Sequence, residues 1–420
     1  MKTFKPKLFE VFGGYSKKQL VSDLIAGLIV AIIALPLSIA LAIASGVSPE
    51  RGLYTAIVAG FVIALLGGSR VNISGPTAAF AAIVAGIVAE HGIEGLAIAT
   101  LMAGAMLIIM GLLRLGTLIK YIPTTITVGF TAGIAVTIVI GQIKDFLGLT
   151  FAPGTNAVEA MEKVEAIAKS ITTLNVWAVA VGVVALAILI VWPKISKKIP
   201  GSLIAVLVLT VAVALIGLRV NTIGDLYTIS ASLPPFSLPE INWEKIVVLI
   251  PSAFTIAILA GIESLLSCVV SDKMIDDKHN SNTELIAQGA GNICSALFGG
   301  IPATGAIART AANVKNGGRS PISGMVHALV LLLVLVLLMP YAAFIPMPVI
   351  AAVLFIVAYN MSEWRHFVSI CKKEPLYETL VLVLTFVLTV VFDLVVAIAV
   401  GLAVHYLIVI IKKLVKKKAA

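Results

Sequence analysis

Long apolar stretches separated by short polar segments recur along the whole chain. Because a membrane-spanning helix needs roughly 20 apolar residues, this pattern predicts an all-α polytopic membrane protein. We place fourteen apolar segments, at 23–46, 51–67, 76–90, 95–114, 121–143, 174–192, 200–217, 246–271, 283–298, 304–314, 321–340, 345–360, 376–391 and 393–411. The third and tenth are too short to cross a membrane alone, and each follows a stretch rich in Gly, Ser or Pro, at 72–76 and 299–302. We therefore expect two half-helices preceded by extended chain.

The two short segments occupy matching places in the two halves of the chain. Seven segments lie in 23–235 and seven in 236–412, and Pro76 and Pro302 each mark the entry to the third segment of their half. An odd number of crossings inverts the second half relative to the first, so the pattern predicts two inverted seven-segment repeats with a site between the interrupted helices. We expect the extended stretches before the two prolines to pair with each other.

Basic arms, 1–22 and 413–420, flank the two repeats. In this topology 23 Lys and Arg residues fall on the side of both termini, six fall on the other side, and Arg309 lies within the tenth segment. The positive-inside rule then places both termini in the cytoplasm, with the protein in the cell inner (plasma) membrane. We expect the C-terminal lysines to face anionic membrane lipid.

Composition removes the main alternatives to a membrane transporter. Only 12% of the residues are charged, against roughly 25% in a soluble domain. The net charge of +9 is spread between apolar runs rather than gathered on a soluble face, so we expect no nucleic-acid partner. No P-loop, nucleophile–base pair, redox motif or metal-ligand spacing is present in the sequence, so we expect neither an enzyme nor a metal or other cofactor, and ion gradients must supply the energy.

The starts of the two half-helices are the first candidate site. Paired extended stretches would bring two helix N-termini together near the membrane midplane, where unsatisfied N–H groups and two positive dipole ends favour an anion. The side chains expected around this point are small or apolar, which suits recognition by backbone N–H groups: Thr77, Ala78, Thr304, Gly305, Ala306 and Ile307.

Two ionisable residues within apolar segments are the next candidates. Glu263 is the sole charge between Ile246 and Ser271, and such a residue marks an ion or proton pathway by default. Ser267 lies one turn later on the same face and is a candidate partner in a coupling-ion site. Arg309 is a candidate source of a positive field that attracts anions. The alternative is that Glu263 is held permanently by Arg309 or by backbone amides.

Three stretches of the sequence resemble the SulP family of anion transporters, also called the solute carrier 26 family. The first stretch comprises 36–40 and 46–54, with the run Gly-Val-Ser-Pro-Glu-Arg-Gly-Leu-Tyr. The second is 67–78, which is similar to the family's third-helix entry. The third comprises 288–292 and 298–310, which is similar to its ninth and tenth helices. The resemblance extends in order over essentially the whole chain.

This resemblance implies a fourteen-helix fold with a core domain, helices 1–4 and 8–11, that moves against a gate domain, helices 5–7 and 12–14. It also implies a homodimer. The family's acidic position in helix eight falls on Glu263, and its basic position in helix ten falls on Arg309. The anion would lie between the third and tenth helix starts, and Tyr121 is a candidate for closing the site from the gate side. The binding positions so implied are Thr77, Ala78, Gly305, Ala306 and Ile307.

Two departures from the family pattern affect these expectations. Many members have Gln after the proline of helix one, where this chain has Leu37, so a polar contact to the substrate is missing. Members usually continue into a cytoplasmic STAS domain of roughly a hundred residues, a typical small-domain length. This chain ends at Ala420, so we expect that domain to be absent, either by truncation or in a naturally short form.

We therefore expect a secondary active transporter of small anions that works by elevator-like alternating access. The candidate substrates are a dicarboxylate such as fumarate, or an inorganic anion such as sulfate or bicarbonate, with protons coupled through Glu263. A sodium-coupled bicarbonate symporter, with Glu263 and Ser267 as the cation site, is the main rival. An uncoupled, channel-like anion conductor is the second. A nucleobase carrier of the same fold is less favoured because a backbone-lined pocket offers few side chains to recognise a base.

Overall fold

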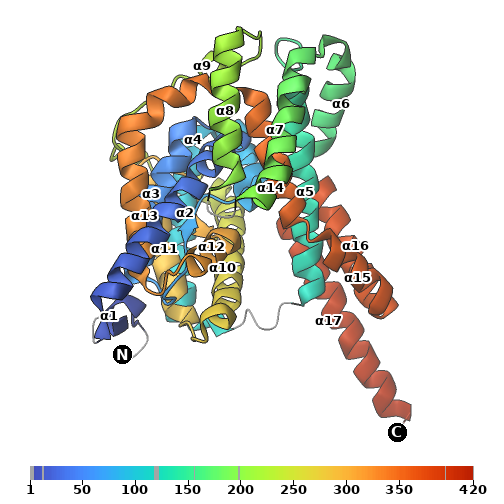
Figure 1. Cartoon of the computed structure of the whole chain (residues 1–420). Coiled ribbons are helices and arrows are strands. Elements are labelled where there is room, and N and C mark those ends of the chain that lie inside the picture. The colour runs from blue at the N-terminus through green and yellow to red at the C-terminus, as the bar shows by residue number, and fades with distance from the viewer. Residues whose placement is uncertain are drawn as a thin grey trace.

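The computed structural model describes residues 4–11, 14–117, 123–155, 157–196, 199–392 and 394–419, which are mainly helical (Figure 1). Eight helical stretches are long and apolar enough to cross a membrane. They contain α2 (Lys17–Ala44), α3 (Pro49–Leu66), η2 (Ala78–Phe80) with α4 (Ala81–Leu112), α5 (Thr124–Leu147), α7 (Val176–Ile195), α10 (Trp243–Ile275), α13 (Pro321–Leu338) with η5 (Met339–Phe344), and α14 (Met347–Met361) with α15 (Trp364–Lys373).

Further helices complete the apolar segments predicted from the sequence. Shorter apolar helices occur in α8 (Gly201–Ile216), α16 (Leu376–Val391) and α17 (Leu394–Ala419), and two more helices are α11 (Ser281–Leu297) and α12 (Ile307–Lys315). The remaining elements connect or cap these helices: α1 (Lys7–Val11), α6 (Ala160–Ser170), η4 (Ile171–Thr173) and α9 (Ile223–Leu226). The expected all-α polytopic fold is confirmed.

The third and fourth predicted segments meet inside the gap that the prediction leaves between residues 90 and 95. They form one helical element, α4, with a sharp bend at Gly92, where φ is 69° and ψ is −175°. Only glycine adopts this backbone conformation without a steric penalty. The chain thus turns between the two helices at Gly92, among the polar residues Glu90, His91 and Glu94.

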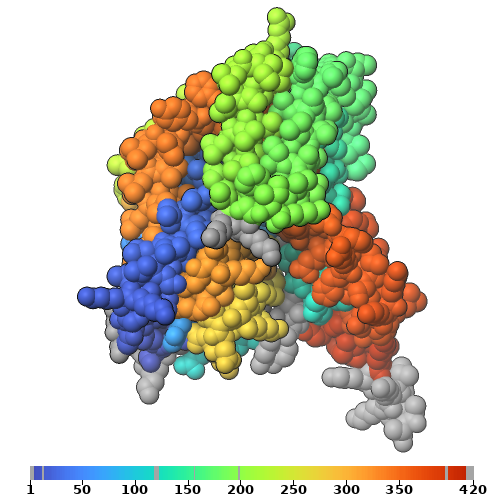
Figure 2. All heavy atoms as spheres, viewed as in Figure 1, coloured from blue at the N-terminus to red at the C-terminus, as the bar shows by residue number. Residues whose placement is uncertain are grey.

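The helices pack in two groups. The core group contains α2, α3, α4, α10, α11, α12 and α13, with α11 packed against α4 and α3, and α13 packed against α3 and α2. The gate group contains α5, α7, α8, α14, α16 and α17, with α5 packed between α14 and α16. In the space-filling view, α10 (yellow) lies at the centre of the lower half and α16 (red) at its right, while α7 and α8 (green) cover the centre and right of the upper half (Figure 2).

Two short strands cross the centre of the core group. β1 (Ser74–Gly75) and β2 (Thr304–Gly305) pair antiparallel, with Ser74 opposite Gly305 and Gly75 opposite Thr304. The predicted pairing of two extended stretches is thus confirmed. The placement of the second stretch before Pro302 was wrong, because β2 follows this proline.

Hydrogen bonds from two helices explain the position of β2. The Ile301 amide donates to Thr55 Oγ1 of α3 at 2.7 Å, and the Ala303 amide donates to Asn292 Oδ1 of α11 at 2.8 Å. The chain on both sides of Pro302 is therefore held by side chains of α3 and α11, while proline itself has no N–H to donate. Strand pairing begins only beyond this anchored segment.

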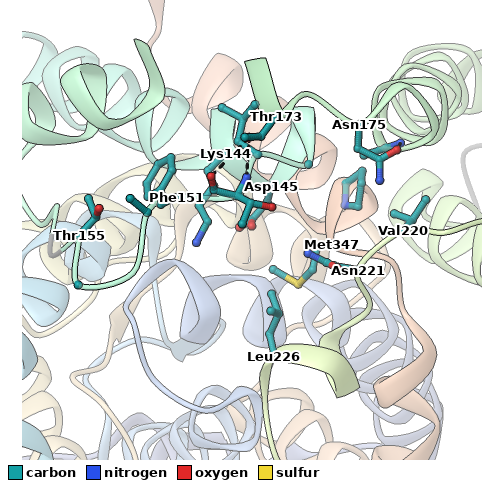
Figure 3. Close-up of a pocket in the computed structure, with 17 residues that line it drawn as sticks. Lys144, Asp145, Phe151, Thr155, Thr173, Asn175, Val220, Asn221, Leu226 and Met347 are labelled. Carbon is teal, nitrogen blue, oxygen red and sulfur yellow. Dashed lines mark hydrogen bonds between the residues drawn. The ribbon is translucent and has the colours of Figure 1, made fainter. Parts of the chain in front are cut away.

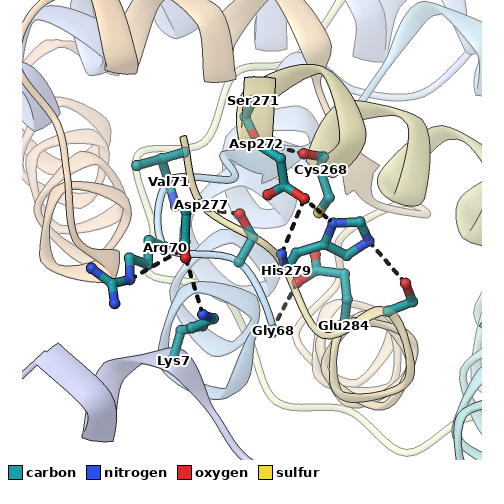
Figure 4. Close-up of polar contacts among 12 residues, drawn as sticks. Lys7, Gly68, Arg70, Val71, Cys268, Ser271, Asp272, Asp277, His279 and Glu284 are labelled. Atoms are coloured by element: carbon teal, nitrogen blue, oxygen red, sulfur yellow. Dashed lines mark hydrogen bonds and ion pairs between the residues drawn. The ribbon is translucent and has the colours of Figure 1, made fainter. Parts of the chain in front are cut away.

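On the side of the N-terminus, buried carboxylates fix the ends of the core helices. Asp23 of α2 is fully buried and accepts hydrogen bonds from Tyr15 Oη at 2.6 Å and Ser320 Oγ at 2.5 Å, which ties α2 to the start of α13. Burial, followed by the Asp23 carboxylate, raises the pKa of Tyr15 to about 12. A neighbouring cluster joins Asp277 to Lys7 and Arg70 (Figure 4).

Candidate functional site

The two half-helices begin at opposite ends of the β1–β2 ribbon. Ala306, which precedes α12, donates its amide to the Ile73 carbonyl oxygen at 2.8 Å, and η2 begins three residues after β1. No side chain caps the first turn of η2 or of α12. Each helix runs away from the ribbon, so the positive ends of both helices point back toward it. This arrangement favours an anion.

The residues predicted around these helix starts differ in exposure. Ala78 is buried, Thr77 and Ala306 are partly buried, and Ile307 is 41% exposed, so Ile307 lies beside open space rather than in packed protein. Gly305 lies in β2, where an added Cβ would be only 2.7 Å from Asn72 Nδ2. The structure thus places these five positions at one ribbon, with side chains too small to cover the helix N-termini.

Arg309 is buried in α12 directly behind the ribbon and is 4% exposed. Its Nη2 atom donates to the Pro76 carbonyl oxygen at 2.5 Å. Within the described chain, its Nη1 atom has no hydrogen-bond partner. An added Cβ on Gly75 would be 2.7 Å from Nη1, so the absence of a side chain at this position makes room for the guanidinium. One end of the guanidinium is therefore buried against Gly75 without a hydrogen-bond partner among the described residues.

Glu263 of α10 is joined to the first half-helix rather than to Arg309. The Thr77 hydroxyl donates to Glu263 Oε2 at 3.0 Å. Among the ion pairs of the described residues, none joins Glu263 to Arg309 within 4.0 Å. The structure therefore does not hold the two charges in the permanent contact that the alternative interpretation requires.

Ser267 points into a different environment from Glu263. Its hydroxyl is fully buried and donates to Asn72 Oδ1 at 2.7 Å, and it lies 3.1 Å from Thr310 Oγ1. No hydrogen bond between these described residues joins Ser267 to Glu263, although they are one turn apart. The hydroxyl connects α10 to the chain before β1 and to α12 instead.

Sequence reasoning missed a buried polar network behind the ribbon. Glu284 Oε1 accepts hydrogen bonds from Asn72 Nδ2 at 2.7 Å, Ser264 Oγ at 3.0 Å and Gln288 Nε2 at 3.1 Å, and Glu284 Oε2 accepts from the Gly68 amide at 2.9 Å. These side chains are buried, so they fix the relative positions of α10, α11 and the chain before β1.

The sequence does contain a pattern that indicates this buried polar network. Glu284, Gln288 and Asn292 are spaced four residues apart, which places them on one face of a helix. Asn292 Nδ2 extends the set by donating to the Ala303 carbonyl oxygen at 2.9 Å, next to β2. Three polar side chains on one face of a membrane helix predict an interior polar contact, since lipid offers them no partner.

Two positions that the sequence singled out, Tyr121 and Leu37, are not part of the geometry described above. Tyr121 lies outside the described residues. Leu37 is partly buried and packs against the apolar core, as its side chain allows.

In the described part of the chain, no group of three or more His, Cys, Asp or Glu side chains could hold a metal ion.

A separate cavity of about 460 Å³ lies away from the helix starts, between the C-terminal end of α5 and the N-terminal ends of α7 and α14 (Figure 3). Lys144, Asp145 and Asn221 contribute polar groups to its wall. The Lys144 ammonium lies 4.9 Å from the centre of the Phe151 ring. None of the predicted anion-binding residues lines this cavity.

Paired interrupted helices with uncapped N-termini, set in a bundle of many spans, define a membrane transporter. The chain matches the Sulfate permease family over residues 20–385. It therefore belongs to this family, SulP/SLC26, as the sequence resemblance implied.

Individual relatives extend this result. The chain is 46% identical to "Putative sulfate transporter YvdB" of Bacillus subtilis (strain 168), over 86% of this chain and 68% of that protein. It is 34% identical to "Bicarbonate transporter BicA" of Picosynechococcus sp. over 83% of this chain. It spans only 62% of that protein's length.

Solved structures agree with the fold. The transmembrane domain of a cyanobacterium bicarbonate transporter BicA superposes with a TM-score of 0.82 at 30% identity, covering 91% of this chain and 98% of that one. SLC26A9 superposes with a TM-score of 0.87 at 20% identity, covering 96% of this chain and 68% of that one. At this identity the second likeness concerns the fold alone.

Proposed function

We propose that this protein is a secondary active transporter of small anions that binds its substrate at the β1–β2 ribbon. The observation that carries the proposal is the meeting of two uncapped helix starts beside buried Arg309, whose Nη1 group has no hydrogen-bond partner among the described residues. Backbone N–H groups would contact the anion around Thr77, Ala78, Gly305, Ala306 and Ile307. The sulfate and bicarbonate named in its relatives are anions of suitable size.

Alternating access follows from the packing in two groups. The ribbon, Arg309 and Glu263 all belong to the core group, so the complete site can move as a rigid unit. Sliding this unit along the gate group would expose the anion to one side of the membrane and then to the other, as in an elevator. A homodimer joined through the gate groups would hold them fixed, and both termini would lie in the cytoplasm.

Protons are the proposed coupling ion, with Glu263 as the proton-binding residue. Its hydrogen bond from Thr77 places the carboxyl at the start of the first half-helix, where a negative charge would compete with a bound anion. A proton on Glu263 removes that competition, so proton and anion bind together. The second candidate is a sodium-coupled bicarbonate symporter, favoured by the likeness to BicA. A cation site would then have to use Glu263 without Ser267, which is engaged by Asn72.

The test is uptake of labelled fumarate, sulfate or bicarbonate into proteoliposomes, under an inward proton gradient and, separately, an inward sodium gradient. We expect accumulation above the external concentration with the proton gradient. Sodium-driven bicarbonate uptake would replace the first candidate by the second. Equilibration without accumulation under either gradient would indicate an uncoupled conductor.

Two variants connect this assay to the site. Glu263→Gln is expected to retain anion binding and to lose proton-driven accumulation, whereas Glu244→Gln, an exposed residue of the same helix, should behave like the wild type. Arg309→Ala should weaken anion binding, since it removes the buried positive charge. An unaltered dissociation constant for Arg309→Ala would show that the helix ends suffice without it.

A further inference from the structure

His327 of α13 is a buried ionisable residue that the proposed function does not use. It is 1% exposed, and neither ring nitrogen has a hydrogen-bond partner among the described residues. Buried polar groups in native proteins are nearly always hydrogen-bonded, so an unpartnered imidazole at the centre of a protein needs an explanation.

The position of His327 points to the anion site. An added Cβ on Gly60 would be 3.1 Å from the Ser74 carbonyl oxygen and 4.0 Å from His327 Nδ1, so the ring lies beside β1. The next residue, Gly75, adjoins Arg309 Nη1, and the Arg309 guanidinium is close enough to act electrostatically on the His327 ring. The imidazole and the guanidinium therefore both lie beside β1.

Arg309 is the charged group that acts on His327. Around α13, the ionisable groups of the packed elements lie mostly at helix ends or are engaged elsewhere: Lys7 and Glu10 of α1, Lys17, Lys18 and Asp23 of α2, Glu50, Arg51 and Tyr54 of α3, and Tyr341 of η5. Asp23 is occupied by Tyr15 and Ser320, and Arg51 donates to the Gly299 carbonyl oxygen. The field at the imidazole thus changes chiefly with the state of the Arg309 site.

We propose that His327 is a second proton-binding residue of the transport site, coupled to the anion through Arg309. This inference rests on the proposed anion transport. An anion at Arg309 offsets the guanidinium charge, and a proton can then add to the free lone pair of the imidazole without facing an uncompensated cation. By linkage, a proton on His327 strengthens anion binding by the same factor. When the anion leaves, the restored field expels the proton to the same side.

The proton balance is simple. One proton from water binds one ring nitrogen of His327 as one anion binds, and both are released together, so no covalent bond between heavy atoms forms or breaks. Glu263 and His327 lie on different elements, α10 and α13, and both respond to Arg309. In this proposal, each group can gain a proton when an anion offsets the charge of Arg309.

Isothermal titration calorimetry of the purified full chain, with sulfate and fumarate as probes, counts the protons taken up per anion when it is run in buffers of different ionisation enthalpy. We expect fewer protons per anion for His327→Gln than for the wild type, and none for His327→Gln combined with Glu263→Gln. His405→Gln, which changes a partly buried histidine of the gate group, should match the wild type.

A second measurement leaves His327 in place. In Glu263→Gln alone, we expect anion affinity to fall by up to tenfold per pH unit over the pH interval in which His327 loses its proton, because one linked proton remains. A flat profile, together with an unchanged proton count for His327→Gln, would overturn the inference while leaving anion transport intact. If the wild type binds neither probe and takes up no bicarbonate in the proteoliposome assay, the proposed function fails and the inference fails with it.

Discussion

Gly305 of β2 is the position where the structure makes the sharpest quantitative prediction. An alanine Cβ at this position would lie 2.7 Å from Asn72 Nδ2, 2.8 Å from Asn72 Oδ1 and 3.1 Å from the Ser264 Cα. Cβ atoms do not approach other heavy atoms this closely, so the Asn72 amide has to retreat. Gly305→Ala is therefore a steric test of the link between the ribbon and the polar network.

The loss of stability expected for Gly305→Ala follows from the hydrogen bonds that Asn72 makes. Its Nδ2 atom donates to the charged Glu284 at 2.7 Å, and its Oδ1 atom accepts from Ser267 and Thr310 at 2.7 and 3.0 Å. Overpacking costs about 1–3 kcal/mol, and a lost hydrogen bond to a charged group costs about 1.5–3 kcal/mol. We expect a loss of about 3 kcal/mol in the free energy of unfolding, which at roughly 2 °C per kcal/mol lowers Tm by about 6 °C.

Thermal unfolding in detergent measures this loss, and sulfate or fumarate binding reports on the site in the same sample. Gly86→Ala is the matched control, because nothing lies within 4 Å of an added Cβ at Gly86. We expect Gly305→Ala to lower both Tm and anion affinity, and Gly86→Ala to lower neither. Equal Tm and affinity in the two variants would refute the idea that Asn72 positions the ribbon.

Three further substitutions test other contacts. Ala306→Phe should abolish anion uptake at an unchanged Tm, since its ring would cover the start of α12; normal uptake would place the site elsewhere. Thr77→Val removes the hydrogen bond to Glu263 and should shift the pH dependence of uptake, and an unshifted profile would disconnect Glu263 from the first half-helix. Tyr15→Phe should lower the free energy of unfolding by about 1–3 kcal/mol, measured by thermal unfolding. Because the phenol pKa is raised from 10.0 to about 12, the wild type should lose this advantage between those pH values, and the variant should not.

Much of the fold could be predicted from the sequence because apolar segments in a membrane have to form helices. The two interruptions could also be found, since Gly and Pro at 72–76 and 299–302 break that pattern in matching places. The break at Gly92 could be found as well, because Gly92 lies among the polar residues Glu90, His91 and Glu94. The position of β2 depends on Thr55 and Asn292, which are distant in the sequence from this strand.

The candidate site, like the fold, could be predicted only in part from the sequence. Local reasoning placed Glu263, Arg309 and the small residues of the helix starts on the correct elements, since their charge or size is unusual for their segments. It paired Ser267 with Glu263 from helical spacing alone, whereas the hydroxyl bonds to Asn72 across the core. The buried carboxylate of Glu284 was overlooked because its partners outside α11 come from two distant parts of the chain, the stretch before β1 and α10.

The pairing of β1 with β2 has a consequence for biosynthesis. The two strands lie about 230 residues apart, so at roughly 5–20 residues per second the ribosome needs on the order of 10–50 s to make the second after the first. During that interval the first strand has no partner edge, and Asn72 lacks its acceptor on Glu284. The nascent first half consequently enters the bilayer with unsatisfied polar groups. The centre of the protein, where the anion would bind, is among the last parts of the chain to assemble.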